Sequence, residues 1–263
     1  MKGKSGSIRR KLLPAGTFVL IILLWWALSA TGLIPAYMLP SPADVVSAFI
    51  RDFPNLMSHA LVSLQEAIYG LLIGTILAFG LACAMDRFLV LEQSVMPLLV
   101  VTQTIPTIAI APLLVLWMGF DMAPKITLVV ITTFFPIAVG LLEGFKSADP
   151  DAVALLRSMN ASRWQIFHHV KIPAALPFFF SGLRISASYA VVGAVISEWL
   201  GGFEGLGVYM TRVRKAYAFD KMFAVILLVA VVSLLLMWIV NLLRKLSMPW
   251  LQARNTGPKR HTH

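Results

Sequence analysis

The stretch Glu143–Pro177, EGFKSADPDAVALLRSMNASRWQIFHHVKIPAALP, is the longest polar interruption in an otherwise apolar chain. Apolar residues at helical spacing predict a helix over Asp151–Met159. Asn160 follows this helix, and Asn is second only to Gly in taking the left-handed conformation that ends a helix. The stretch therefore predicts a helix that stops at a sharp turn.

A second helix is expected directly after the turn. Ser162 and Gln165 form the Ser-x-x-Gln pattern of a capping box, which predicts a short helix to about Val170. Pro173 is expected to stop this helix, because proline lacks a backbone donor and clashes with the preceding turn. A simple connector between two membrane spans would not need so much local specification.

The composition places the chain among membrane proteins. Of 263 residues, 59% are hydrophobic and 13% are charged, and the charged fraction is about half that of a soluble domain. A membrane-spanning helix needs about 20 mostly apolar residues, so we expect an all-α integral membrane protein with about six spans over residues 13–243. The expected spans are Leu13–Thr31, Ser58–Met85, Leu89–Met118, Pro124–Leu142, Leu176–Glu198 and Met222–Leu243.

The net charge of +10 is interpreted as an orientation signal. With the N-terminus inside, most Lys and Arg residues fall in the segments that this topology places in the cytoplasm, as the positive-inside rule requires. These segments are the basic N-terminus 1–12, the loop 143–177 and the basic tail 244–263, which we expect to be disordered. Nucleic acid is not expected as a partner.

The first apolar run is longer than the core of a signal peptide, which favours an uncleaved anchor.

The polar stretch resembles the cytoplasmic "EAA" loop of ABC importer permeases. The family pattern is Glu-Ala-Ala, three residues, Gly, a short helix and Leu-Pro-x-Ala-x-Pro, and Ile172–Pro177 is similar to its end. Ala154 stands at the family's Glu and Asn160 at its Gly. The resemblance implies a type I ABC importer permease fold, with the short helix docked on a separate ATPase subunit. The residues expected to couple the chain to that subunit are Asn160, Ala161, Ser162, Arg163, Trp164, Gln165, Phe167 and His168.

Further motifs resemble the sulfonate, nitrate, taurine and thiamine-precursor pyrimidine branch of these permeases. They include Leu39-Pro40-Ser41-Pro42, followed by a short amphipathic helix, and Phe135-Pro136-Ile137. The resemblance implies a homodimer of this chain, two ATP-binding subunits and an extracytoplasmic substrate-binding protein. It also implies a bacterial inner-membrane location with both termini cytoplasmic. ATP and Mg would belong to the ATPase, so this chain is expected to bind no cofactor and to catalyse no reaction.

The third expected span is interrupted at Pro106 and Pro112. Discontinuous helices in transporters commonly mark the pathway, although a proline kink that only fits a crowded bundle is an equal alternative. Glu66 and Glu198 lie near span ends, where an acid often marks function. The residues expected to line the pathway or contact substrate are Glu66, Gln103, Pro106, Trp117, Tyr189, Glu198 and Trp199.

Aromatic residues beside these carboxylates suit a flat, neutral or cationic heterocycle. The favoured substrate is a thiamine-precursor pyrimidine of the hydroxymethylpyrimidine type. Riboflavin, aliphatic sulfonates, taurine and nitrate are the alternatives. Arg184, inside the fifth span, is expected to reach back to water with its long side chain.

Two glycine-rich stretches have structural interpretations. The Gly70-x-x-x-Gly74 stripe predicts close helix packing, within the subunit or at a dimer contact. Gly201–Gly207 predicts a flexible external turn before a short segment, Val208–Lys215. No phosphate-binding loop is present, since Gly3-Lys4-Ser5 lacks the upstream glycine.

An ion-coupled secondary transporter is the alternative class, but the repeated halves common in such transporters are not evident.

Overall fold

The computed structural model describes residues 4–35 and 37–249, and side chains from residue 13 onward within them. Every regular element in this part of the chain is a helix. The described residues form two compact units: 4–35 and 37–59 with 209–228, and 60–208 with 229–249. The expectation of an all-α protein is confirmed.

Five described helices are long and apolar enough to span a membrane, and a sharply bent pair provides a sixth candidate. This agrees with the prediction of about six spans. The last helix continues through Ser247, past the predicted end at Leu243, and the rest of the predicted tail, from residue 250 on, lies outside the described residues. The five are α1 (Lys4–Ala30), α3 (Phe53–Arg87), α6 (Met122–Lys146), α9 (Ile172–Leu200) and α11 (Phe219–Ser247).

The predicted third span is two helices, α4 (Leu89–Thr104) and α5 (Thr107–Met118), which meet at an angle of 99°. The break falls at Ile105, whose backbone is extended (φ −81°, ψ 122°). A proline forces the residue before it out of the helical region, so Pro106 explains the bend. Pro112 lies inside α5 without breaking it, and the prediction of a second interruption there is wrong.

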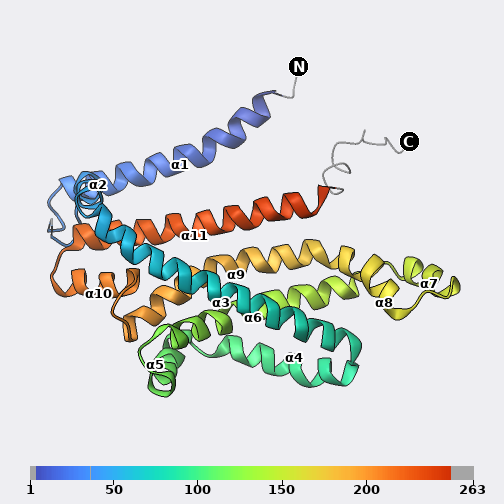
Figure 1. Ribbon diagram of the computed structural model, residues 1–263. Helices are drawn as coiled ribbons and strands as arrows, with labels where there is room; N and C mark the ends of the chain where they lie inside the picture. Colours follow the sequence, from blue (N-terminus) through green and yellow to red (C-terminus); the bar gives the residue numbers. More distant parts are fainter. Residues whose placement is uncertain (1–3, 36, 250–263) are drawn as a thin grey trace. The chain divides into compact units, whose positions relative to one another are not determined.

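Close packing of α6 on α9 forms the core of the second unit (Figure 1). Small residues allow this approach. A methyl group added at Gly144 would lie 2.6 Å from the Cα atom of Ala175, and one added at Gly140 would lie 3.0 Å from the carbonyl oxygen of Phe178. Without the glycines, these two helix backbones could not come so near each other.

The glycine stripe of α3 packs against α6 within the same unit. A methyl group at Gly70 would collide with Val129, and one at Gly74 would lie 2.6 Å from the hydroxyl oxygen of Thr133. The stripe is therefore used for packing within the subunit, and the alternative of a dimer contact is not supported by its burial.

In the first unit, the short helix expected after Pro42 is present as α2 (Pro42–Arg51), and Ser41 and Asp44 form a capping box at its start. Asp52 follows α2 and accepts a hydrogen bond from the Tyr209 hydroxyl of α10 (Leu206–Lys215), with Lys221 Nζ 3.2 Å away. The hydrogen bond from Tyr209 and the nearby ammonium hold the pKa of Asp52 below its usual value. This carboxylate thus ties together three segments that are far apart in sequence.

The packing of α6 on α9 leads to a matched pair of glycine substitutions. Gly182→Ala places a methyl group against the backbone of Pro136 and Ile137, whereas Gly80 has open space around it. Since backbone cannot move aside cheaply, Gly182→Ala should destabilise the protein by about 1–3 kcal/mol. Thermal unfolding in detergent should show a lower midpoint for Gly182→Ala and little change for Gly80→Ala. Equal midpoints would contradict this account of the core.

Candidate functional site

The predicted turn of the polar stretch is present. Helix α7 (Pro150–Ser158) ends at Met159, and Asn160 follows with φ 58°. The backbone N–H of Asn160 donates to Arg157 O at 3.0 Å, and that of Ala161 donates to Leu156 O at 2.9 Å. These two bonds form a Schellman motif, which satisfies the last carbonyls of the helix. Asn160 therefore supplies the geometry for which the family pattern has glycine.

The capping box after the turn is also confirmed. The Ser162 hydroxyl accepts from the backbone N–H of Gln165 at 3.3 Å, and the Gln165 side chain accepts from the backbone N–H of Ser162 at 2.6 Å. These bonds start α8 (Arg163–Ile166). The turn and the cap together fix the direction in which α8 leaves α7.

Pro173 does not stop the second helix, so that prediction is wrong. From Arg163 to Leu200 the chain is one continuous helix of 38 residues, with a π-helical turn over Phe167–Lys171. In this turn the backbone N–H of Ile172 donates to Phe167 O, one residue further back than in an α-helix. Pro173 follows this π-helical turn as the second residue of α9, and the wider turn accommodates it within the helix.

The two predicted aromatic coupling residues lie in different environments. Trp164 is 70% exposed, and its ring stacks with His168 at 6.3 Å between centroids. Phe167 is half-buried, and its ring packs 5.2 Å from that of Phe145 on α6. Trp164 is thus available to a partner surface, while Phe167 fixes α8 to the core.

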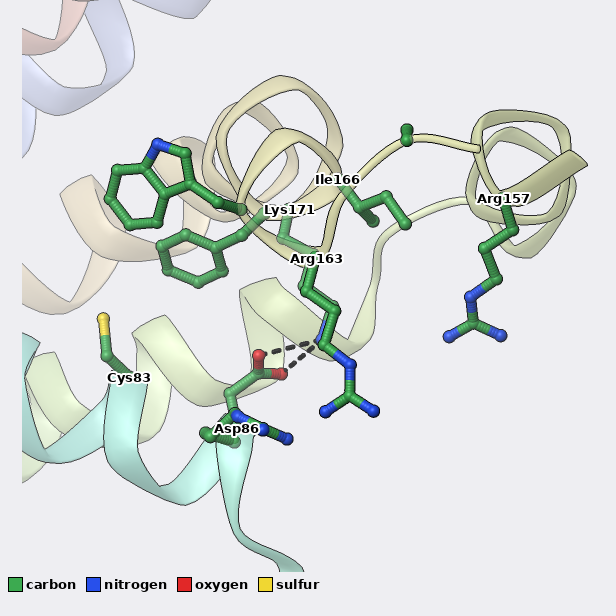
Figure 2. Close-up of a pocket in the computed structure, with 10 residues that line it drawn as sticks. Cys83, Asp86, Arg157, Arg163, Ile166 and Lys171 are labelled. Carbon is green, nitrogen blue, oxygen red and sulfur yellow. Dashed lines mark hydrogen bonds and ion pairs between the residues drawn. The ribbon is translucent and has the colours of Figure 1, made fainter. Parts of the chain in front are cut away.

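A cavity of about 800 Å³ lies between the segment 157–171, which contains α8, and the last turn of α3. Figure 2 shows Asp86 paired with Lys171 at 2.7 Å, with Arg157 and Arg163 projecting from the neighbouring segments. Arg87, on α3, also lines the cavity. Among the described residues none of these three guanidinium groups has an ion-pair partner. The site therefore combines an exposed indole with unpaired positive charge, which suits an acidic protein surface.

The predicted pathway residues divide into two groups. Glu66 and Glu198 are buried by their own subunit, at 0% and 2% exposure. The others are open on the described chain and are not brought together at one point. They are Gln103, Pro106, Trp117, Tyr189 and Trp199.

The two carboxylates belong to a buried polar network. Glu66 on α3 accepts from Lys125 Nζ of α6 at 2.8 Å. Glu198 on α9 accepts from the hydroxyl of Ser63 and from the backbone N–H of Gly207, both at 2.5 Å. Buried charges are retained when they are paired and hydrogen-bonded. This network joins α3, α6 and α9 to the glycine turn, so the two acids bind groups of their own subunit.

Sequence reasoning missed Lys125 and Ser63. Lys125 stands at the start of the expected span Pro124–Leu142 and was given no role, yet it lies in α6 with 4% exposure. One signal was available, because two spans carry an acid near the same end, and a buried acid needs a cationic partner. Ser63 had no such signal, since a serine in an apolar span has many structural uses.

These features define a class of protein. The described helices include five candidate membrane spans, a bent pair and a polar helix–turn–helix segment over residues 150–171. The model of the family described as "Binding-protein-dependent transport system inner membrane component" matches residues 70–247. The chain belongs to this family, the non-catalytic transmembrane permease subunits of ABC importers.

Individual relatives support the assignment to the sulfonate, nitrate, taurine and thiamine-precursor pyrimidine branch. The formylaminopyrimidine transport permease protein ThiX of Halalkalibacterium halodurans is 35% identical, over 89% of this chain and 94% of the relative. The putative aliphatic sulfonates transport permease protein SsuC of Bacillus subtilis is 30% identical, over 93% and 88%. A solved amino acid ABC transporter superposes with a TM-score of 0.62 at 15% identity, over 75% of this chain and 96% of that one, which shows the fold alone.

The left-handed turn at Asn160 can be tested by two substitutions at that position. Asn160→Gly should preserve solute uptake, since glycine adopts positive φ without strain. Asn160→Val should reduce uptake severalfold, because a β-branched residue is strained there by about 1–2 kcal/mol. Uptake by membrane vesicles holding the full transporter is the measurement, with permease abundance checked by immunoblot. Equal uptake by the two variants would show that the turn is unimportant.

Proposed function

We propose that this chain forms the path for a small solute in an ATP-driven importer, and that α8 transmits the action of an ATPase subunit. The supporting observation is the construction of the docking segment. A Schellman turn and a capping box hold α8 in place, while Trp164 remains exposed beside the basic cavity. In this proposal residues 143–177 and both termini face the cytoplasm, and two copies of the chain assemble with two ATPase subunits.

ATP hydrolysis takes place on the partner subunit in this proposal. The partner's acidic groups meet Arg87, Arg157 and Arg163, and its apolar surface covers Trp164. Because α8 continues into α9 without a break, movement of α8 reorients α9 and opens the path to one side of the membrane or the other. An extracytoplasmic binding protein delivers the solute.

The favoured solute is a pyrimidine precursor of thiamine. Support comes from the resemblance to ThiX over nearly the whole chain. Exposed aromatic rings at Trp117 and Tyr189 also suit a flat heterocycle. Aliphatic sulfonates and riboflavin are the alternatives.

Coupling through α8 predicts the behaviour of two Trp164 variants. Trp164→Asp should abolish uptake while the ATPase remains able to hydrolyse ATP, because a charge replaces the apolar contact at the interface. Trp164→Phe should retain most uptake. Trp164 is a better target than Phe167, whose replacement would also disturb the core. ATP hydrolysis and uptake should be measured together in proteoliposomes. Unchanged uptake by Trp164→Asp would exclude α8 as the coupling segment.

The substrate proposal predicts selective uptake. Proteoliposomes with the permease, its ATPase and its binding protein should accumulate radiolabelled formylaminopyrimidine or hydroxymethylpyrimidine in an ATP-dependent manner. Unlabelled pyrimidine should compete, and taurine and riboflavin should not. Accumulation of taurine or riboflavin in its place would assign the chain to another member of the branch.

A further inference from the structure

Arg184 lies near the middle of α9. At 1.5 Å per residue it is about 18 Å from Ile172 and about 24 Å from Leu200. The expectation that it reaches back to water assumed a helix beginning at Leu176, which put Arg184 about 12 Å from the helix start. Because α9 continues from α8, Arg184 stands well inside a continuous helix. Counted from Pro177, where the segment proposed to face the cytoplasm ends, it lies about 10 Å along the helix axis.

One face of α9 is open around Arg184 and carries polar side chains among apolar ones such as Ile185 and Val192. Ser181, Arg184 and Ser188 follow one another at helical spacing, and Tyr189 lies beside Ser188. Ser181, Arg184 and Tyr189 are exposed and Ser188 is partly exposed, whereas the opposite face of α9 is buried in the core. A cavity of about 300 Å³ lies at this face. It is lined by Arg184, Ile185, Ser188, Tyr189 and Met237 of α11.

The open face of α11 differs in character. Its exposed side chains are all apolar between residues 226 and 243, which is the composition of a lipid-facing surface. They include Leu227, Val231, Leu234, Leu235 and Trp238. An arginine within a membrane span that faces lipid is costly, and such residues mostly face a water-filled cavity or the interior of a bundle.

Arg184 has no ion-pair partner among the described residues. A guanidinium group carries five N–H donors and no acceptor, and a tyrosine hydroxyl can also donate. The acids expected to line the path, Glu66 and Glu198, are enclosed in the buried network. The exposed charge midway along α9 is therefore positive.

We infer that the face of α9 bearing Ser181, Arg184, Ser188 and Tyr189 is a wall of the solute path, and that Arg184 and Tyr189 bind an acceptor oxygen of the passing solute. The ligand is a small solute with a carbonyl or anionic oxygen and no positive charge. This deepens the proposed function and rests on it. It also replaces the sequence-based reasoning that an acidic path would suit a cationic heterocycle.

The reactivity of a cysteine at position 184 toward a water-soluble reagent tests whether this face of α9 lines an aqueous path. The solute need not be known for this test. Arg184→Cys, in membranes holding the full transporter and opened to both sides, should react with the anionic reagent sulfonatoethyl methanethiosulfonate. Leu235→Cys on the apolar face of α11 is the matched control and should react at least tenfold more slowly. The parent chain, whose only cysteine is Cys83, gives the background. Reaction of Arg184→Cys no faster than the Leu235→Cys control would overturn the inference.

Uptake tests the hydrogen bond to the solute. Arg184→Gln should lower uptake of the transported solute tenfold or more, and Arg184→Lys should retain more of it because the charge remains. Labelled formylaminopyrimidine tests the carbonyl ligand, and labelled ethanesulfonate, which has no ammonium group, tests the anionic one. Unchanged uptake by Arg184→Gln would overturn the role of Arg184.

The two proposals can fail separately. If the parent transporter carries neither labelled solute, the substrate assignment fails, and the labelling comparison still decides whether Arg184 lines an aqueous path. If a pyrimidine is carried but Arg184→Cys reacts no faster than the Leu235→Cys control, the importer assignment stands. The inference that this face of α9 lines the solute path is then wrong.

Discussion

The close approach of α6 and α9 is the constraint on which the second unit depends. Gly140 and Gly144 let the two backbones meet near the end that carries α7 and α8, and Gly182 extends the contact along α9. The hydrophobic effect does not drive helices together within lipid, because the lipid tails are themselves apolar. Close packing at small residues and hydrogen bonds between helices therefore hold the bundle together. Close packing at one end and the buried Glu198 network at the other hold α9 along most of its length.

The buried network adds a polar constraint to this apolar packing. Glu66, Lys125 and Glu198 come from three different helices, and each would be costly to bury alone. Lys125 pairs with one oxygen of Glu66, while the other oxygen of Glu66 is buried without a hydrogen-bond partner among the described residues. The bonds from Lys125 to Glu66 and from Ser63 to Glu198 connect α3 to α6 and to α9. Gly205 and Gly207 lie directly against the Glu198 side chain, where any larger residue would collide. The glycines of this turn are therefore required by the contact with Glu198, beyond any need for flexibility.

The sequence was most informative where structure is determined locally. The cap at Ser162, the left-handed turn at Asn160 and the break at Pro106 each depend on a few neighbouring residues, and each was predicted correctly. Pro173 was misjudged because a π-helical turn upstream accommodates it, and no simple residue pattern announces such a turn. The roles of Glu66 and Glu198 depend on residues such as Lys125 and Ser63, far away in the chain. Periodicity indicates that a residue is in a span, but it does not identify the partner it meets across the bundle.

The uninterrupted helix from Arg163 to Leu200 has a mechanical consequence. At 1.5 Å per residue it is a rod of about 57 Å, and its contacts with α6 run from Ala175 through Gly182 to Gly193. The bond between Glu198 and Ser63 fixes its far end to α3. A rod held at so many points cannot pivot against its neighbours. A displacement of its Trp164 end would therefore carry α6 and the attached part of α3 with it.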